Sequence, residues 1–154
     1  MGDGEPIRRI ISWDEYNELV SSIAAQIGDK VPDCIVGLTR GGLIPAVQFS
    51  HMFNVKLYTL NISLRDGKAS SQGFDWRQLR KYSNILIVDD INDSGATLWE
   101  VANQCYGREI QKPRFATLLS KDSSEFDNLI AGEHINKNKD CLLYTSDAAD
   151  DLLC

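Results

Sequence analysis

The chain has 154 residues, 43% of them hydrophobic, and a formal net charge of −6 at pH 7. This length and hydrophobic content suit a single domain with its own core. The negative charge argues against general nucleic-acid binding, which needs a basic surface. The sequence has no run of about 18 apolar residues, as a membrane span would require.

The four cysteines favour a reducing compartment. They are irregularly spaced and form no CxxC pair (Cys34, Cys105, Cys141 and Cys154). Cys34 and Cys105 lie in apolar segments, where a free buried thiol is usual. Residues 1–5 are polar and acidic, unlike a signal peptide. We therefore expect a cytoplasmic protein.

The first predicted helix covers residues 13–27. Ser12 and Glu15 have the spacing of a capping box, and Gly28 ends the helix. The apolar residues between them recur at helical spacing (Tyr16, Leu19, Val20, Ile23, Ala24 and Ile27). Residues 34–38 then form an apolar run of strand length.

Strands and helices continue to alternate along the chain. A second helix follows Gly41 and Gly42 and has Pro45 in its first turn. Residues 55–62 are rich in β-formers, and residues 85–88 form a continuous apolar strand. A third helix ends at Gly107, and residues 115–119 supply another strand. This order predicts a single-domain α/β fold with a parallel sheet and helices on both faces. In such folds, ligands bind beyond the carboxyl ends of the strands.

An acidic pair and a turn of small residues follow the strand at 85–88. After Asp89 and Asp90, residues 91–97 read INDSGAT and open a helix. The N–H groups and the dipole at a helix start form an anion site, which Gly95 would let a ligand approach closely. Carboxylates beside an anion site suit a sugar phosphate such as ribose 5-phosphate. Alternatively, the segment is an ordinary helix cap next to two exposed aspartates.

Taken whole, residues 85–98 resemble the phosphoribosyl pyrophosphate signature of the type I phosphoribosyltransferases. That signature has a hydrophobic strand, two acidic residues and a D-T/S-G-x-T turn, and the resemblance extends from about residue 10 to 140. It implies that Asp89 and Asp90 bind the ribose hydroxyls, directly or through Mg²⁺. It implies that Asp93 acts as general acid and base near the purine N7. The 5-phosphate would be cradled by five consecutive residues (Asp93, Ser94, Gly95, Ala96 and Thr97).

The resemblance includes a second loop, in which Thr39, Arg40, Gly41 and Gly42 precede the second helix. A similar S/T-R-G-G-x-x-P stretch binds pyrophosphate in the family. Thr39, Arg40 and Gly41 would hold this leaving group, with Arg40 as a catalytic residue. The family often has a cis peptide there, which would fall between Thr39 and Arg40. A simple tight turn is the alternative.

Two further segments are candidates for closing the site and reading the base. The polar interval between Ile62 and Ile85 matches the place of a mobile lid in the family, or else is a partly helical surface excursion. Lys121 ends a strand and is either a solvated strand end or, as in the family's 6-oxopurine branch, a donor to the exocyclic O6. The distant His51 and His134 are read as neither metal ligands nor catalytic bases. The three tryptophans are expected to be packing residues (Trp13, Trp76 and Trp99).

The C-terminus departs from the family pattern. In the 6-oxopurine branch, a tryptophan-bearing strand follows a segment like residues 132–137 and helps to hold the base. That strand is missing here, so we expect a reduced or incomplete hood. The last fourteen residues, CLLYTSDAADDLLC, resemble a translated sequencing adapter. We interpret residues 1–140 as the phosphoribosyltransferase domain and 141–154 as a non-native tail, the alternative being a genuine acidic tail.

The resemblance implies an Mg²⁺-dependent enzyme of purine salvage. Its substrates would be phosphoribosyl pyrophosphate and a 6-oxopurine base, and the family is commonly oligomeric, so a homo-oligomer is expected. No nucleic-acid or membrane partner is expected. Two alternatives stay open: a pyrimidine or adenine phosphoribosyltransferase, and a regulator that binds phosphoribosyl pyrophosphate without turnover.

Overall fold

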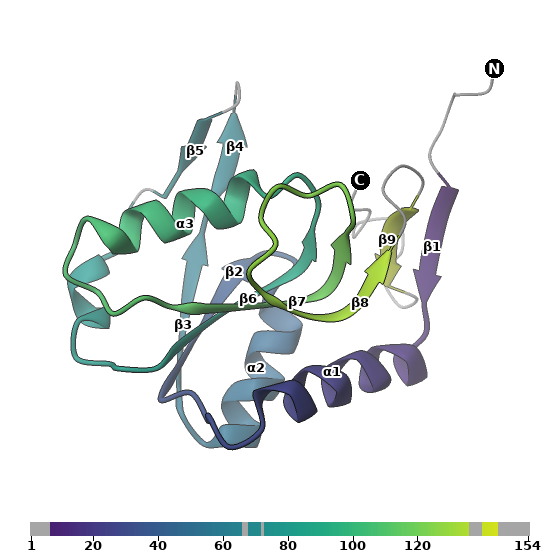
Figure 1. Ribbon diagram of the computed structural model, residues 1–154, viewed down its shortest axis with the longest axis horizontal. Coiled ribbons are helices and arrows are strands. Elements are labelled where there is room, and N and C mark those ends of the chain that lie inside the picture. Colours follow the sequence, from purple (N-terminus) through teal and green to yellow (C-terminus); the bar gives the residue numbers. More distant parts are fainter. Residues whose placement is uncertain (1–6, 66–67, 72, 136–139, 145–154) are drawn as a thin grey trace.

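The computed structural model describes residues 7–65, 68–71, 73–135 and 140–144, arranged as thirteen elements (Figure 1). In chain order these are β1 (Ile7–Ile11), α1 (Trp13–Ile27), β2 (Cys34–Thr39), α2 (Leu43–Phe53), β3 (Lys56–Asn61), β4 (Ser63–Arg65), β5 (Lys68–Ser70), the 3₁₀ helix η1 (Trp76–Leu79), β6 (Ile85–Asn92), α3 (Ala96–Tyr106), β7 (Arg114–Lys121), β8 (Ile130–Ile135) and β9 (Asp140–Tyr144).

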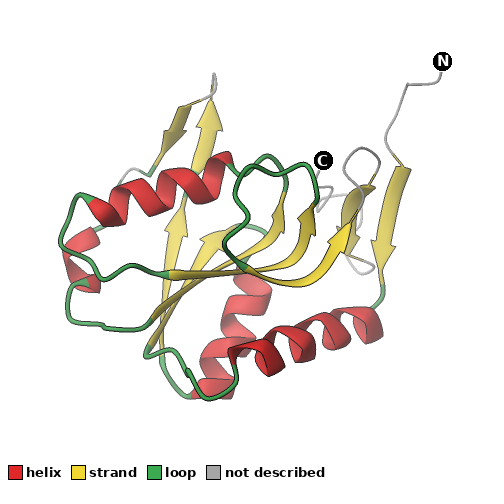
Figure 2. Ribbon diagram, viewed as in Figure 1, coloured by secondary structure: helices red, strands yellow, loops and turns green. Residues whose placement is uncertain are grey.

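A five-stranded sheet in the order β3-β2-β6-β7-β8 forms the centre, and all its neighbouring strands are parallel. From β2 the chain moves outward to β3, and from β6 it moves the other way through β7 to β8. The boundary between β2 and β6 is therefore a topological switch point, where α/β sheets bind ligands. Helices α1 and α2 lie on one face and α3 on the other (Figure 2). The predicted α/β fold is confirmed.

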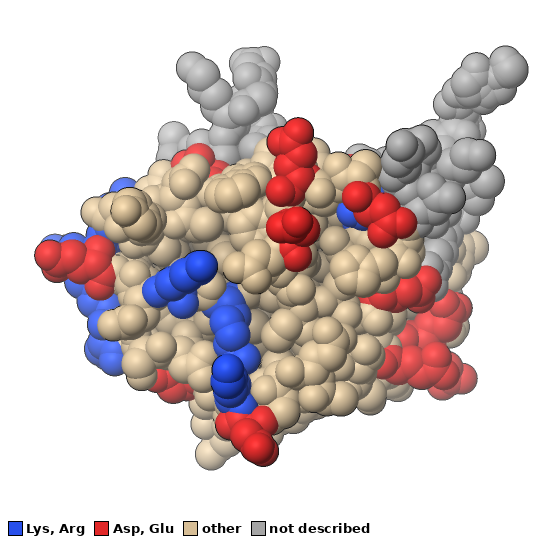
Figure 3. Space-filling model, viewed as in Figure 1, with Lys and Arg blue, Asp and Glu red and all other residues tan. Residues whose placement is uncertain are grey.

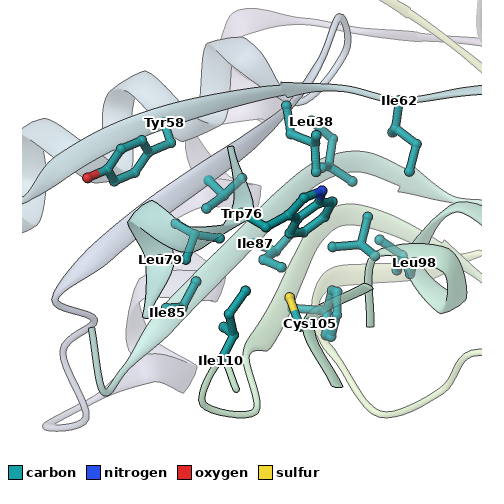
Figure 4. Packing of buried hydrophobic residues seen from close by; sticks show 14 of the residues in the cluster. Leu38, Tyr58, Ile62, Trp76, Leu79, Ile85, Ile87, Leu98, Cys105 and Ile110 are labelled. Atoms are coloured by element: carbon teal, nitrogen blue, oxygen red, sulfur yellow. The ribbon is translucent and has the colours of Figure 1, made fainter. Parts of the chain in front are cut away.

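The core has one layer on each side of this sheet, because successive strand residues point to opposite faces. In β6, Leu86 and Val88 pack with α1 and α2, whereas Ile85 and Ile87 pack with α3 and η1. Figure 4 shows the second layer, in which Trp76 lies among aliphatic side chains. Fully burying one such side chain contributes about 1.5–3 kcal/mol, so the two layers fix the sheet as a rigid base for its loops.

Helix α1 begins and ends where the sequence predicts. Ser12 Oγ accepts a hydrogen bond from the Glu15 amide at 3.1 Å, which satisfies one of the open N–H groups of the first turn. Gly28, with φ of 58°, ends the helix, because that backbone conformation favours glycine. The buried stripe of α1 covers β7 and β8.

The interval between β3 and β6 has two different halves. Its first half contains the antiparallel hairpin β4–β5. In its second half, Trp76 and Leu79 of η1 are buried in the core, and Arg80 Nε donates to the Arg108 carbonyl at 2.8 Å. Of the segment expected to be a mobile lid, only the region of the β4–β5 hairpin stays a candidate, because η1 is anchored on the core.

No helix among the described residues is long and apolar enough to cross a membrane.

A small second sheet joins the two ends of the described chain. β9 runs parallel to β1, in a register that places Ile7 opposite Asp140 and Ile11 opposite Tyr144. A short strand is thus present where we expected the tryptophan-bearing strand of the hood to be missing, although its sequence, DCLLY, has no tryptophan. Residues 141–144 of the segment interpreted as a tail belong to this strand, and residues 145–154 lie outside the described part.

Candidate active site

The candidate residues lie on three loops that follow β2, β6 and β7. These strands are neighbours and parallel, so their carboxyl ends meet at one edge of the sheet (Figure 1). Strand β6 is longer than predicted and runs through the acidic pair to Asn92, because Asp89, Ile91 and Asn92 stay in register with β7. The acidic pair therefore belongs to the rigid sheet and not to the turn after it.

Asp89 and Asp90 are held by short backbone contacts. Asp89 Oδ1 accepts from the Asp90 amide at 2.9 Å, and Asp90 Oδ1 accepts from the Ile91 amide at 2.7 Å. The Asp90 side chain is buried, with 3% exposure. Burial of the Asp89 carboxyl, followed by the charge of Asp90, raises the pKa of Asp89 well above its usual value. A cation or a hydrogen-bond donor bound here would relieve that crowding of charge.

The loop after β2 packs directly on this acidic pair. A Cβ atom on Gly41 would overlap the Asp90 carboxylate, and one on Gly42 would overlap the Val88 carbonyl oxygen. Only glycines allow so close an approach, which brings Thr39, Arg40 and Gly41 to the end of β6. The peptide bond between Thr39 and Arg40 is cis, as the family resemblance predicted. Arg40 is exposed at the edge of the sheet.

The loop after β6 forms the start of α3. Gly95 occupies the N-cap position with φ of 95°, and α3 begins at Ala96. Ser94 Oγ accepts from the Ala96 amide at 3.2 Å, whereas Gly95 at the N-cap position has no side chain with which to cap the helix. Thr97 is half-buried, whereas Asp93 and Ser94 are exposed. Backbone amides of an eleven-residue helix thus face outward beside two carboxylates, an arrangement suited to a phosphate.

Lys121 and Asp93 form an ion pair. The family resemblance gave them separate roles at the base, Lys121 at the exocyclic O6 and Asp93 near N7. Lys121 Nζ lies 2.9 Å from Asp93 Oδ1. The lysine side chain is 11% exposed and the aspartate side chain 50%. The lysine stem is therefore enclosed while the charged pair opens at the edge of the site. An ammonium donor and a carboxylate side by side can serve both a carbonyl oxygen and an adjacent ring N–H.

Sequence reasoning missed the contribution of the loop between β7 and β8. The Glu125 amide donates to the Ser94 carbonyl at 3.2 Å, and a Cβ atom on Gly95 would lie 2.8 Å from both Cβ and N of Phe126. The glycine in the sequence indicated a close approach, but its partner lies 31 positions away and has no recognisable motif. Asn92, just before the predicted loop, was missed for the same reason.

The remaining sequence candidates lie apart from these loops. His51 on α2 and His134 on β8 are exposed. Trp76 is a core residue as predicted, whereas Trp13 and Trp99 remain 43% and 49% exposed. A pocket of about 590 Å³ lies beside α3, between Trp99 and residues 126–128. None of its lining residues is a candidate site residue, so the polar loops and not this apolar hollow define the site.

Sequence comparisons agree with this geometry. Residues 12–139 match the model of the phosphoribosyl transferase domain family. A xanthine-guanine phosphoribosyltransferase of Chromohalobacter salexigens is 32% identical over 116 residues, which cover 72% of this chain and 67% of that protein. A protein of the same name from Cereibacter sphaeroides is 29% identical over 132 residues, which cover 73% of this chain and 71% of that protein.

Solved structures show the same fold at lower identity. A purine phosphoribosyltransferase from Pyrococcus horikoshii superposes with a TM-score of 0.75 at 22% identity, covering 89% of this chain and 92% of that one. The xanthine-guanine-hypoxanthine phosphoribosyltransferase of Helicobacter pylori gives 0.74 at 19% identity, covering 94% and 95%. With the family model matching residues 12–139, the chain belongs to the phosphoribosyltransferase family.

Proposed function

We propose that this protein transfers the phosphoribosyl group of phosphoribosyl pyrophosphate to a 6-oxopurine base and releases pyrophosphate, a reaction of purine salvage. The observation that carries the proposal is the meeting of the acidic pair, the phosphate loop and the Lys121–Asp93 pair at one edge of the sheet. The relatives named xanthine-guanine phosphoribosyltransferase support the choice of base.

In this proposal the ribose phosphate lies across the ends of β2 and β6. Residues 93–97 receive the 5-phosphate through the amides at the start of α3, with Ser94 and Thr97 as hydroxyl donors. Asp89 and Asp90 accept from the ribose hydroxyls. Both carboxylates stand on a strand of the central sheet, so they are positioned before the substrate arrives.

Mg²⁺ fits the donor set at Asp89 and Asp90. The two adjacent carboxylates are oxygen ligands, and burial followed by the charge of Asp90 raises the pKa of Asp89. Mg²⁺ commonly takes one or two carboxylates and completes its shell with water and substrate phosphates. When bound, it would neutralise charge on the departing pyrophosphate. Arg40 and the backbone around Gly41 would hold the same leaving group from the loop packed on Asp90.

The base would enter at the Lys121–Asp93 pair. Lys121 donates to the exocyclic O6, and Asp93 accepts the proton that the base loses from N7 as its N9 attacks the anomeric carbon. The C–O bond to pyrophosphate breaks at the same carbon, and its electron pair leaves with the pyrophosphate. The protein contributes positioning and charge stabilisation and forms no covalent bond to the sugar.

The test of this function is pyrophosphate release against a panel of bases. Purified protein with phosphoribosyl pyrophosphate and Mg²⁺ should release pyrophosphate only when hypoxanthine, guanine or xanthine is added, and the matching nucleotide should appear in equal amount. Release driven by adenine or a pyrimidine would contradict the base assignment. Tight binding of phosphoribosyl pyrophosphate with no turnover on any base would indicate the regulator instead.

Lys121 gives a separate prediction about base recognition. The Lys121→Met variant keeps the enclosed aliphatic stem but lacks the ammonium, so affinity for hypoxanthine or guanine should fall by about 10- to 100-fold, as for the removal of one charged hydrogen bond. Affinity for ribose 5-phosphate should change by less than about threefold, because its donors are the backbone amides at the start of α3 and the hydroxyls of that loop, and not Lys121. Calorimetric titration of both ligands checks this. Lys112→Met, at an exposed lysine, is the matched control, and equal losses for both ligands would refute the assignment.

A homo-oligomer is part of the proposal, and helix α2 offers the contact. Leu43, Ile44, Val47 and Met52 are 36%, 42%, 38% and 47% exposed on α2, and exposed apolar clusters of this kind commonly form self-complementary interfaces. We expect Val47→Glu to convert the oligomer to monomers in light scattering, whereas Asn103→Glu on α3 should leave it intact. A monomeric wild-type protein would show that this face has another role.

We propose that residues 1–140 carry this function in the cytoplasm. No nucleic-acid or membrane partner is part of the proposal. Two free buried thiols, Cys34 and Cys105, support a reducing compartment. On the face seen in Figure 3, uncharged side chains cover most of the surface and acidic groups lie among the basic ones. Such a face lacks the continuous positive potential that nucleic-acid binding requires.

A further inference from the structure

Asn92 has a buried side-chain amide that joins two loops of the site. Its hydrogen-bond partners Ser120, Ser124 and Phe126 are not among the residues assigned to substrate. It is the last residue of β6 and is 1% exposed. Its Nδ2 donates to Ser120 Oγ at 3.1 Å and to the Phe126 carbonyl at 2.7 Å. Its Oδ1 accepts from Ser124 Oγ at 2.9 Å. One side chain at the end of β6 therefore binds three points on β7 and the loop that follows.

The same loop is bound to itself and to the phosphate loop. Ser124 Oγ also accepts from the Phe126 amide at 3.1 Å, and the Ser124 amide donates to the Lys121 carbonyl at 3.0 Å. The Glu125 amide donates to the Ser94 carbonyl at 3.2 Å, next to Gly95, which has room for no side chain against Phe126. Residues 120–126 and 92–95 thus form one hydrogen-bonded unit.

This unit sets the position of Lys121 relative to the phosphate cradle. Lys121 follows Ser120, whose hydroxyl accepts directly from Asn92. After Lys121 comes a turn in which the Ser124 amide donates to the Lys121 carbonyl. Asn92 holds this turn through the Ser124 hydroxyl. A buried network in which each member has its partner is rigid, and loss of one member leaves other buried groups unpaired. A shift of about 1 Å in a positioning group can lower a rate by about a hundredfold.

We propose that Asn92 is a positioning residue that fixes the base-binding lysine to the phosphate loop, so that base and sugar phosphate are held at reacting distance. This inference rests on the proposed function for the role of Lys121. The clamp itself, which joins residues 92–95 to residues 120–126, is independent of that role and is tested separately.

Two variants remove opposite sides of the network. Asn92→Asp keeps the size and the acceptor for Ser124 but loses the donors to Ser120 and Phe126. Ser124→Ala removes the hydroxyl that donates to Asn92 Oδ1 and accepts from the Phe126 amide. Ser124 is half-buried in a loop, so the variant should still fold. For each, kcat with hypoxanthine should fall by about tenfold or more, with the KM for phosphoribosyl pyrophosphate within about threefold of wild type. Ser123→Ala, at the exposed neighbouring serine, is the control and should keep wild-type kcat. A lower melting temperature with unchanged kcat would mean a structural role only and would overturn the proposal.

A double-mutant cycle tests whether the network acts through Lys121. In the Lys121→Ala background, Ser124→Ala should cost less than about twofold in kcat, because groups that act as a unit are not additive. A full additional loss would overturn the link to Lys121.

Hydrogen exchange separates this inference from the proposed function. Ser124→Ala should speed exchange of the amides in both loops, residues 94–97 and 122–126, by at least about tenfold, since local opening controls such exchange. Acceleration confined to residues 122–126 would overturn the clamp. Hydrogen exchange does not depend on turnover. If the wild-type protein were inactive on every base, the proposed function would be refuted, and the exchange rates would still show whether Asn92 and Ser124 link the two loops.

Discussion

Replacing Asp89 and Asp90 together by asparagine is expected to abolish productive substrate binding while leaving a folded protein. Removing one charge-assisted hydrogen bond costs about 1.5–3 kcal/mol, so kcat/KM should fall by at least about a hundredfold for the pair. The fold should survive because an asparagine oxygen can still accept from the Asp90 and Ile91 amides, as the carboxylates do. Steady-state kinetics and circular dichroism check the two statements.

The single variant Asp89→Asn should moreover be more stable than the wild type at neutral pH in buffer with a chelator. The pKa of Asp89 is raised in the folded protein, whereas the unfolded chain should titrate near the usual value of about 3.9. Between these two pKa values the native state holds more protons, so wild-type stability falls as pH rises through this window and stays lower above it.

Urea unfolding across this pH range measures the effect. The advantage of Asp89→Asn should be absent below the unfolded pKa and complete above the folded one. Asp33→Asn should have the opposite effect. Burial would raise the pKa of Asp33, but hydrogen bonds from Ser83 and Asn84 outweigh it and lower this pKa. Asp33→Asn should therefore be less stable than the wild type at neutral pH. A wild type more stable than Asp89→Asn at pH 7 would contradict the raised pKa of Asp89. Undiminished kcat/KM in the double variant would show that the acidic pair is not the ribose site.

The second large effect is expected at Gly95. A methyl group there would lie 2.8 Å from Phe126 Cβ and 2.9 Å from Ser124 Oγ, on a residue with φ of 95°. A non-glycine residue in such a conformation costs about 1–3 kcal/mol, and relief of the clash requires the phosphate loop to move. We expect Gly95→Ala to weaken ribose 5-phosphate by about a hundredfold or more in calorimetry, as the absence of several amide hydrogen bonds implies.

Gly73 provides a matched control for backbone strain. Its φ is 81°, but a Cβ atom there would lie more than 4 Å from every atom of the described part of the chain beyond its immediate neighbours. Gly73→Ala should therefore show the cost of strain alone, with a lower melting temperature and unchanged ribose 5-phosphate affinity. If both variants bind equally well, the amides at the start of α3 do not form the phosphate site.

The elements predicted from sequence were those whose pattern is local. Helix α1 has its cap, its apolar stripe and its terminal glycine in one segment, and its predicted bounds agree with the structure. Strand β8 was missed because Gly132 and two polar residues interrupt it. Its place depends on β7, where Gly132 lies so close that a Cβ atom would be 2.7 Å from the Leu118 carbonyl oxygen. The extension of β6 to Asn92 likewise depends on pairing with β7.

The candidate site divides in the same way. The acidic pair and the phosphate loop are contiguous in sequence, so residue types and spacing were enough to propose them, and the cis peptide at Thr39–Arg40 followed from the family resemblance. The Lys121–Asp93 ion pair and the Asn92 network join positions 28 or more residues apart. A single sequence has no signal for such pairings, because a polar residue at a strand end is usually solvated.

The order of the central strands has a consequence for synthesis of the protein. β2 and β3 leave the ribosome early, yet β2 obtains its second neighbour only when β6, the next strand of the sheet, has been made. Until then the nascent chain carries an open, apolar strand edge, which is a template for aggregation. Chains that terminate between residues 61 and 85 would keep that edge permanently. The ribosome must therefore deliver β6, the strand that carries the acidic pair, before β2 and β3 have a stable partner.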